Sequence, residues 1–430
     1  MDVLRPCRLA LLLSACLLPT ACMARTCIVG AGPSGLSLAW WLTQDGQDVV
    51  VFEKEGRIGG KVMSWTDTTT GHVHDVGANG VYAGYNLTHQ FIARYGLSLE
   101  PAYLFKHGLD ATSSLLRRAI HDPISLVELL TSSASRSASH HDRGMQWMQR
   151  YDQGYEGSPP YATAELARYV EPSAGIFPLM GRQIVGGMKG LFDHVAADLP
   201  AGVVRLNHTA RELTHSSAGP RLDGHQCERI VVTAVPTTVP RTWLPAELRL
   251  LQVTAYFSSI VRCDGSMLRW RPGRHDALIQ RQHADNYTTV FGYHDVSNGD
   301  DEAATRAQMV ASLRADGCAP ATVHFWRLWR DYFPRFLQSD VDSGILRRIE
   351  ALQGTDGVYW AGTYMHFDVV EGALEYSKHL FDTYLSKAAG KAKRRRAGDD
   401  AIAKEGANRR SVDAPHRGTV QGSLEAGSPP

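Results

Sequence analysis

The spacing of apolar residues changes twice near the start of the chain, and these changes predict its local structure. A short apolar run at residues 26–29 precedes a glycine-rich turn, and an apolar segment with helical character follows at residues 36–42. A second apolar run at residues 49–52 ends in an acid, Glu53. Strand, turn, helix and strand in this order predict a βαβ unit.

Three glycines in the turn have the spacing that a bound dinucleotide requires. Gly30 permits a tight turn, Gly32 lets a pyrophosphate approach the backbone, and Gly35 lets helix and strand pack closely. The helix start offers unpaired N–H groups and a partial positive charge for the phosphates. Glu53 ends the second strand, where a carboxylate accepts hydrogen bonds from ribose hydroxyls. The sequence therefore predicts a Rossmann-type dinucleotide site.

Several further segments resemble the superfamily of flavin amine oxidases and protoporphyrinogen oxidase. They are Arg57-x-Gly59-Gly60-Lys61, residues 74–78, residues 186–188 with the strand at 203–213, residues 357–363, and residues 370–373. The resemblance covers about residues 26–388 and implies bound FAD. It implies cofactor contacts, mainly through the backbone, from Gly30, Gly32, Gly35, Glu53, Arg57, Gly59, Gly60, Lys61, Gly77, Ala78, Ala210, Gly362, Thr363, Val370, Glu371 and Ala373. Glu371 has two open interpretations, a ribityl contact or an acid that complements the dipole of its helix.

The resemblance also implies an α/β fold with a discontinuous Rossmann-type FAD-binding domain of the GR2-like flavoprotein kind. Its parts are residues 25–100, 187–240 and 340–388, and two insertions, residues 101–186 and 241–339, form an α+β substrate domain. The first insertion is predicted to be helical, around residues 126–130 and 145–151. The second is predicted to contain strands at 253–257 and 287–291, a helix at 305–313 and a segment at 323–326.

The short loop before the last helix holds the best candidates for a catalytic group. Tyr364 and His366 are expected to face the flavin as a general base or an orienting group; the alternative is that they only pack around the pyrophosphate. Many amine oxidases of the superfamily hold a water at flavin N5 with a lysine, but this chain has no lysine between Lys189 and Lys378. Val369 also replaces an aromatic residue that such enzymes place before the final helix. Both departures argue against ordinary primary-amine oxidation.

With Trp-x-x-Tyr-Phe-Pro at residues 329–334 and no lysine for N5, the chain resembles most the β-cyclopiazonate dehydrogenase group of FAD-dependent oxidases and oxidocyclases within the superfamily. This resemblance implies hydride removal from a hydrophobic small molecule in secondary-metabolite biosynthesis, with O2 reoxidising the flavin. Only one dinucleotide fingerprint occurs, which favours an oxidase over an enzyme with a separate NADPH domain. The alternatives are a secreted amine, amino-acid or prenylcysteine oxidase, and a flavin-fold binding protein without catalysis. An amino-acid substrate would need an arginine such as Arg262, Arg269, Arg271 or Arg281.

The N-terminal segment and the sequons predict passage through the secretory pathway. Residues 1–24 have two arginines, an apolar stretch and small residues, as in a signal peptide. Asn-x-Thr sequons occur at Asn86, Asn207 and Asn286, of which Asn207 is expected in a strand with poor access. Residues 389–430 are polar and basic and predict a disordered tail.

Composition excludes some classes and leaves others open. A formal net charge of +1 gives no reason to expect a nucleic-acid partner, and no segment beyond the leader is apolar enough to span a bilayer. No histidine group has carboxylates at metal-site spacing, so no metal is predicted. Four cysteines follow the leader; Cys27 is expected to be a buried thiol, no disulfide is assigned, and Cys318 is the first position to test for a covalent flavin. The oligomeric state is open.

Overall fold

A computed structural model describes residues 25–82, 84–101, 182–263, 279–282, 286–294, 301–315, 318, 321–366 and 368–389. The predicted leader, the predicted helices of the first insertion and nearly all of the predicted tail lie outside the described residues. The chain divides into two compact units, one up to Phe381 and one from Asp382. The sheets, cavities and contacts below belong to the first unit.

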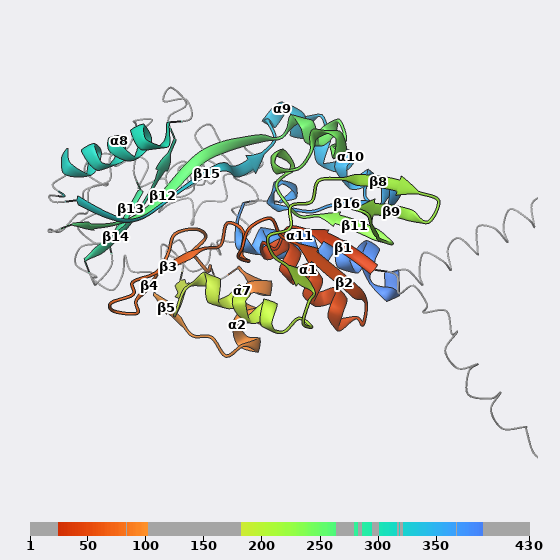
Figure 1. Cartoon of the computed structure of the whole chain (residues 1–430), viewed down its shortest axis with the longest axis horizontal. Coiled ribbons are helices and arrows are strands. Elements are labelled where there is room, and N and C mark those ends of the chain that lie inside the picture. Colours follow the sequence, from red (N-terminus) through yellow and green to blue (C-terminus); the bar gives the residue numbers. More distant parts are fainter. Residues whose placement is uncertain are drawn as a thin grey trace, which may run out of the picture. The chain divides into compact units, whose positions relative to one another are not determined.

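A five-stranded parallel sheet is the core of the nucleotide-binding half (Figure 1). Its order is β16-β11-β1-β2-β7, and every neighbouring pair is parallel. The strands come from three separate stretches of the chain: β1 (Arg25–Val29), β2 (Asp48–Phe52), β7 (Val204–Arg205), β11 (Arg229–Val232) and β16 (Val358–Trp360). The predicted βαβ unit is confirmed as β1, α1 (Pro33–Gln44) and β2.

Three helices surround α1, whose apolar side chains are buried. Leu36, Leu38 and Leu42 are fully buried, and Pro33 begins the helix without needing a hydrogen-bond partner. The helices in contact with α1 or with one another are α2 (Asn86–Arg94), α7 (Met188–Ala197) and α11 (Val370–Leu380). The first and last helices of the cofactor half therefore pack together although they are far apart in sequence.

The second insertion forms an antiparallel sheet, and its strands confirm the prediction from its β-branched and aromatic residues. Its order is β13-β14-β12-β15. The strands are β12 (Gln252–Cys263), β13 (Ile279–Gln282), β14 (Tyr287–Tyr293) and β15 (Ala321–Arg335). Helix α8 (Glu302–Ala315) buries Met309 and Leu313 in one cluster with Val261 and Val290 of the sheet. The expected strands and helix are thus confirmed, and each is longer than its sequence pattern.

Short elements complete the described part. Asn207 follows β7, lies outside any strand and is exposed, so the expectation of a strand residue with poor access is wrong. The remaining strands are β3 (Ser64–Thr66), β4 (Val73–Asp75), β5 (Leu99–Pro101), β6 (Arg182–Ile184), β8 (Leu213–Ser216), β9 (Gly219–Leu222) and β10 (His225–Gln226). The remaining helices and turns are α9 (Gln338–Asp342), α10 (Ile345–Ala351), Pro236–Thr238, Arg241–Trp243, Glu247–Leu250, Thr355–Gly357, Thr363–Met365 and Phe381–Leu385.

Two disulfides correct the reading of the cysteines. Cys27 of β1 is bonded to Cys227, and Cys263 of β12 is bonded to Cys318. The predicted buried thiol at Cys27 is therefore wrong, because the sheet order brings the segment before β11 beside β1 across 200 residues of sequence. The disulfide at Cys318 also removes that sulfur as a free site for a covalent flavin. Over the described residues, no helix is long and apolar enough to cross a membrane.

Candidate functional site

A cavity of about 340 Å³ opens at the carboxyl ends of the parallel strands. Gly30 follows β1, Glu53 follows β2, Thr233 follows β11 and Gly362 follows β16, and all four line it. This is the edge at which open α/β sheets bind ligands, because the strand-to-helix turns converge there. Of the residues predicted from the sequence, those that line the cavity are Gly30, Gly32, Glu53, Gly60, Lys61, Ala78, Ala210, Gly362, Thr363, Tyr364, Val370 and Ala373.

Glu53 is held rigidly at one end of this cavity. Its side chain is buried, and its two carboxylate oxygens accept hydrogen bonds from the N–H groups of Ala31 and Glu55, each at 2.8 Å. Each oxygen keeps a further lone pair, because a carboxylate offers about four acceptor positions. Glu53 is therefore oriented to accept additional hydrogen bonds from two neighbouring hydroxyls, as a ribose presents them.

The glycine turn leaves open space where a pyrophosphate would lie. A Cβ added to Gly32 would meet nothing closer than the Cα of Gly60 at 3.9 Å, so this position opens into the cavity. A Cβ added to Gly35 would lie 2.0 Å from the carbonyl oxygen of Gly30, which only glycine tolerates. The first amides of α1 have no partners within the helix and face an anion site. The observed cradle fits FAD, the predicted cofactor.

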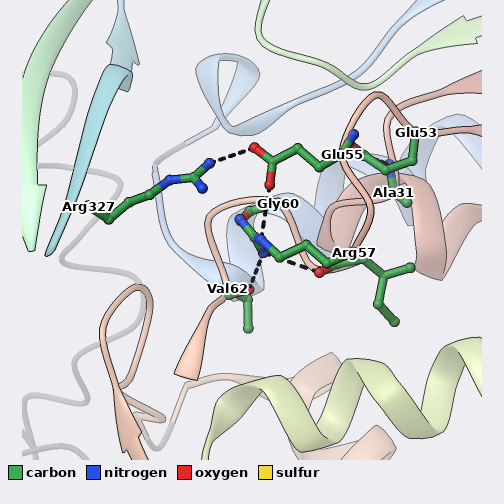
Figure 2. A network of polar contacts seen from close by, with 8 residues as sticks. Ala31, Glu53, Glu55, Arg57, Gly60, Val62 and Arg327 are labelled. Carbon is green, nitrogen blue, oxygen red and sulfur yellow. Dashed lines mark hydrogen bonds and ion pairs between the residues drawn. The ribbon is translucent and has the colours of Figure 1, made fainter. Parts of the chain in front are cut away.

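A series of charged side chains connects the antiparallel sheet, through its strand β15, to the turn after β2 (Figure 2). Arg327 of β15 lies 2.5 Å from one oxygen of Glu55, and Arg57 lies 2.9 Å from the other. Arg57 also donates to the carbonyl of Gly60 at 2.8 Å and has longer bonds to two neighbouring carbonyls. Burial lowers the pKa of Arg57, while Glu55 opposes that shift. Arg57 does not line the cavity; it shapes the glycine turn that does.

A second ion pair, Lys61 with Asp368, also lines this cavity. Lys61 Nζ is 2.8 Å from one oxygen of Asp368 and 3.1 Å from the other, and it lies 4.7 Å from the ring centre of Tyr332. Asp368 also accepts hydrogen bonds from the Thr363 hydroxyl and from the N–H of Phe333. Phe333 adopts a positive φ of 48°, and this bond helps to hold that unusual conformation. Asp368 and Arg327 are site residues that the sequence analysis missed.

A smaller cavity of about 110 Å³ shares a wall with the first. Ala78, Tyr332, Asp368, Val369 and Val370 line both cavities. Most of the remaining lining is aromatic and comes from several separate segments: Tyr82, Tyr85, Tyr256, Phe291 and Phe333. Asp368 is its single charged lining residue among those described. Burial, and to a lesser degree Asp368, raise the pKa of Tyr332, so this phenol stays neutral. Gly77, predicted beside the cofactor, lines this second cavity.

Other predicted residues lie behind the cavity walls. Both oxygens of Glu371 accept hydrogen bonds from the start of α2, namely the N–H groups of Leu87 and Thr88 and the Thr88 hydroxyl. The acid therefore caps a neighbouring helix and does not line either cavity, and burial raises its pKa against these bonds. Gly35 and Gly59 likewise shape the turns and do not line the first cavity.

The two predicted catalytic residues lie in different surroundings. Tyr364 lines the first cavity, but its ring packs in the core near Phe336. Burial raises the pKa of the Tyr364 phenol, which disfavours a role as a base. His366 lies outside both linings, with Nδ1 3.8 Å from a carboxylate oxygen of Glu375. A direct contact of either residue with substrate remains a prediction.

The chain was compared with a family model, with known sequences and with solved structures. Residues 28–95 match the NAD(P)-binding Rossmann-like domain. The chain is 33% identical over 76 residues to an L-amino acid oxidase of Cerastes cerastes, over 18% of this chain and 15% of that protein. It is 47% identical over 55 residues to protoporphyrinogen oxidase 2 of Arabidopsis thaliana, over 13% of this chain and 10% of that protein.

Among solved structures, a fatty acid isomerase from P. acnes that produces CLA is similar with a TM-score of 0.61. The sequence identity is 17%, and the match covers 84% of this chain and 98% of that one. The predicted α/β fold with a Rossmann-type sheet is therefore confirmed. The matched segments span 15% or less of the two sequence relatives. These similarities show the Rossmann-type fold and a short segment in common with an L-amino acid oxidase and a protoporphyrinogen oxidase.

Proposed function

We propose that this protein is an FAD-dependent oxidoreductase that removes a hydride from a hydrophobic small molecule. The observation that carries the proposal is the pair of adjoining cavities. The first has the acid, the open glycine turn and the helix start that a dinucleotide needs, and the second is walled by aromatic rings. Because five residues line both, a substrate in the second cavity would lie next to a cofactor in the first.

The chemistry divides between cofactor and protein. Bound FAD supplies the hydride acceptor. The chain's own residues supply orientation and exclude water, since Tyr256, Phe291 and Phe333 are nearly buried. We infer that O2 reoxidises the flavin, because residues 28–95 hold the dinucleotide fingerprint and the sequence contains no second one. A dry aromatic chamber also suits ring closure after hydride removal, which supports an oxidocyclase of secondary-metabolite biosynthesis.

One observation favours a second candidate, an oxidase of hydrophobic amines. No arginine appears among the described residues that line the second cavity, and most of that lining is aromatic. Arg262, one of the arginines considered for an amino-acid substrate, instead lies with its guanidinium 5.8 Å from the ring centre of Tyr287. The geometry thus supports an amine more than an amino acid, because an amino acid would leave its carboxylate without a cationic partner.

We also propose that the chain enters the secretory pathway. The three sequon asparagines, Asn86, Asn207 and Asn286, are all exposed, which supports glycosylation at each. The two disulfides support an oxidising compartment. Mass spectrometry of the secreted protein before and after removal of N-glycans tests this proposal, and three unmodified asparagines on an intracellular protein would contradict it.

The first experiment on function is purification of the secreted chain and its absorbance spectrum before and after acid precipitation. We expect the bands of oxidised flavin, and a yellow supernatant if FAD is dissociable. Peroxide release is then measured with neutral prenylated aromatics and with hydrophobic amines as two separate panels. Gly32→Asp is the matched control, because its carboxylate would occupy the pyrophosphate position. A colourless folded wild-type protein would overturn the enzyme proposal, and a yellow protein inert on both panels would favour a flavin-fold binding protein.

A further inference from the structure

Two groups of residues that line the first cavity differ in chemical character. In the first group, Glu53 offers its carboxylate to ribose hydroxyls, and the start of α1 offers unpaired N–H groups to phosphates. The second group is Lys61, Thr363, Asp368 and the start of α11 at Val370; Asp368 and Val370 also line the second cavity, which Glu53 does not. Because the adenosine ribose and the pyrophosphate suit the first group, the flavin ring belongs beside the second. This step depends on the proposed binding of FAD.

An almost buried ion pair belongs to that second group. The side chain of Asp368 is 5% exposed and that of Lys61 is 22% exposed. Four hydrogen bonds reach the carboxylate, two from Lys61 Nζ and one each from Thr363 and Phe333, so its acceptor positions are filled. Its charge is therefore balanced mainly by one lysine. Water and salt screen charges weakly at such a site.

We propose that the Lys61–Asp368 pair sets the charge that the flavin ring experiences and so sets its reduction potential. Two-electron reduction adds negative charge to the ring system, which a nearby cation favours and a nearby anion opposes. With both partners present, the two charges nearly cancel. Asp368 thus offsets the effect that Lys61 alone would have on the cofactor, and each residue acts on the reaction through the flavin.

Two nearly isosteric substitutions test this proposal, because they shift the potential in opposite directions. Asp368→Asn leaves the lysine cation unbalanced and raises the potential, and Lys61→Met leaves the carboxylate unbalanced and lowers it. We expect each to change the reduction equilibrium at least tenfold, which is about 30 mV for a two-electron couple. The double variant returns toward the wild-type value. Potentials are measured on flavin-loaded protein by equilibration with reference dyes, without any substrate.

A remote ion pair supplies the matched control. Asp198→Asn removes the charge that pairs with Arg94 at 3.1 Å, outside both cavities, and leaves the potential unchanged. If Asp368→Asn does not retain FAD, Lys61→Met and Lys61→Arg decide, since only the first removes the charge and only the first lowers the potential. Shifts of the same sign in Asp368→Asn and Lys61→Met, or no shift in either, would overturn the proposal. A wild-type protein without flavin would instead refute the proposed function.

Discussion

The two adjoining cavities differ in what builds them. The lining of the first includes glycine turns, helix starts and strand ends that a local sequence pattern specifies. The second is walled mostly by aromatic residues, which come from β12, β14, β15 and the segment around Tyr82 and Tyr85. Under the proposed function, cofactor binding would depend on short motifs, and selection of a substrate would depend on how distant segments pack.

The residues that line both cavities connect the glycine turn of the first to the aromatic walls of the second. Asp368 accepts hydrogen bonds from Lys61, next to the glycine turn, and from the N–H of Phe333 in β15. Arg327 makes a second connection from the same strand, β15, to the turn through Glu55. Changes in the first region should thus affect FAD retention or stability, and changes in the second should affect substrate selection at constant FAD content.

The largest expected effect is a difference in stability between alanine substitutions at two glycines of one turn. Gly35→Ala would place a Cβ 2.0 Å from the Gly30 carbonyl oxygen and 2.8 Å from the Thr233 hydroxyl, so we expect a loss of about 4 kcal/mol in unfolding free energy. A Cβ at Gly32 would lie in open space, so Gly32→Ala should change the unfolding free energy by less than about 1 kcal/mol. Denaturant unfolding of both apoproteins measures the difference. Equal losses would show that the turn is not packed as described.

Removing each disulfide compares the stability of the parallel-sheet half with that of the second insertion. Replacing Cys27 and Cys227 by alanine should lower the unfolding free energy by about 3 kcal/mol, within the usual range for a lost disulfide. The Cys263–Cys318 pair closes a separation of 55 residues against 200 for the first pair, so its loss should cost about 1 kcal/mol less. Denaturant midpoints of the two double variants give the comparison. A reversed order would mean that strain or residual structure outweighs chain entropy.

A substitution in the aromatic cavity should leave the cofactor unaffected. Phe291→Leu keeps most of the volume of a nearly buried side chain but removes a ring that lines the second cavity. We expect KM for a substrate found in the peroxide panels to rise about five-fold, since an aromatic contact contributes about 1 kcal/mol. Flavin content should equal that of the wild type. Loss of flavin with unchanged KM would show that the two cavities are assigned the wrong way round.

The smallest expected effect is at the Arg327–Glu55 contact. Both side chains are about one-third exposed, so solvent screening limits what Arg327→Met can cost to less than about 1 kcal/mol. The variant should bind FAD slightly more weakly, and the difference should shrink at high salt. Titration of apoprotein with FAD at two salt concentrations measures it. The surface variant Lys189→Met, which breaks a pair with Asp193, should show no change in FAD affinity.

The sequence alone determined the nucleotide-binding half with good accuracy. Gly30, Gly32, Gly35 and Glu53 lie in one short segment, and their spacing directly encodes a turn, a helix start and a strand end. The strands of the second insertion were also predictable, because enrichment in β-branched and aromatic residues is a local property. For the same reason the predictions of α1 and β2 needed no information from the rest of the chain.

Only the tertiary structure decided which distant residues meet. The partner of Cys27 is 200 residues away, and Glu371 caps a helix whose start lies more than 280 residues earlier. Asp368 and Arg327 carry no motif, since their roles arise from the packing of β15 against the glycine turn. A pairing between segments depends on the order of strands and the placement of loops, and a local pattern contains neither. The second cavity and the charge balance at Asp368 are therefore properties of the folded chain.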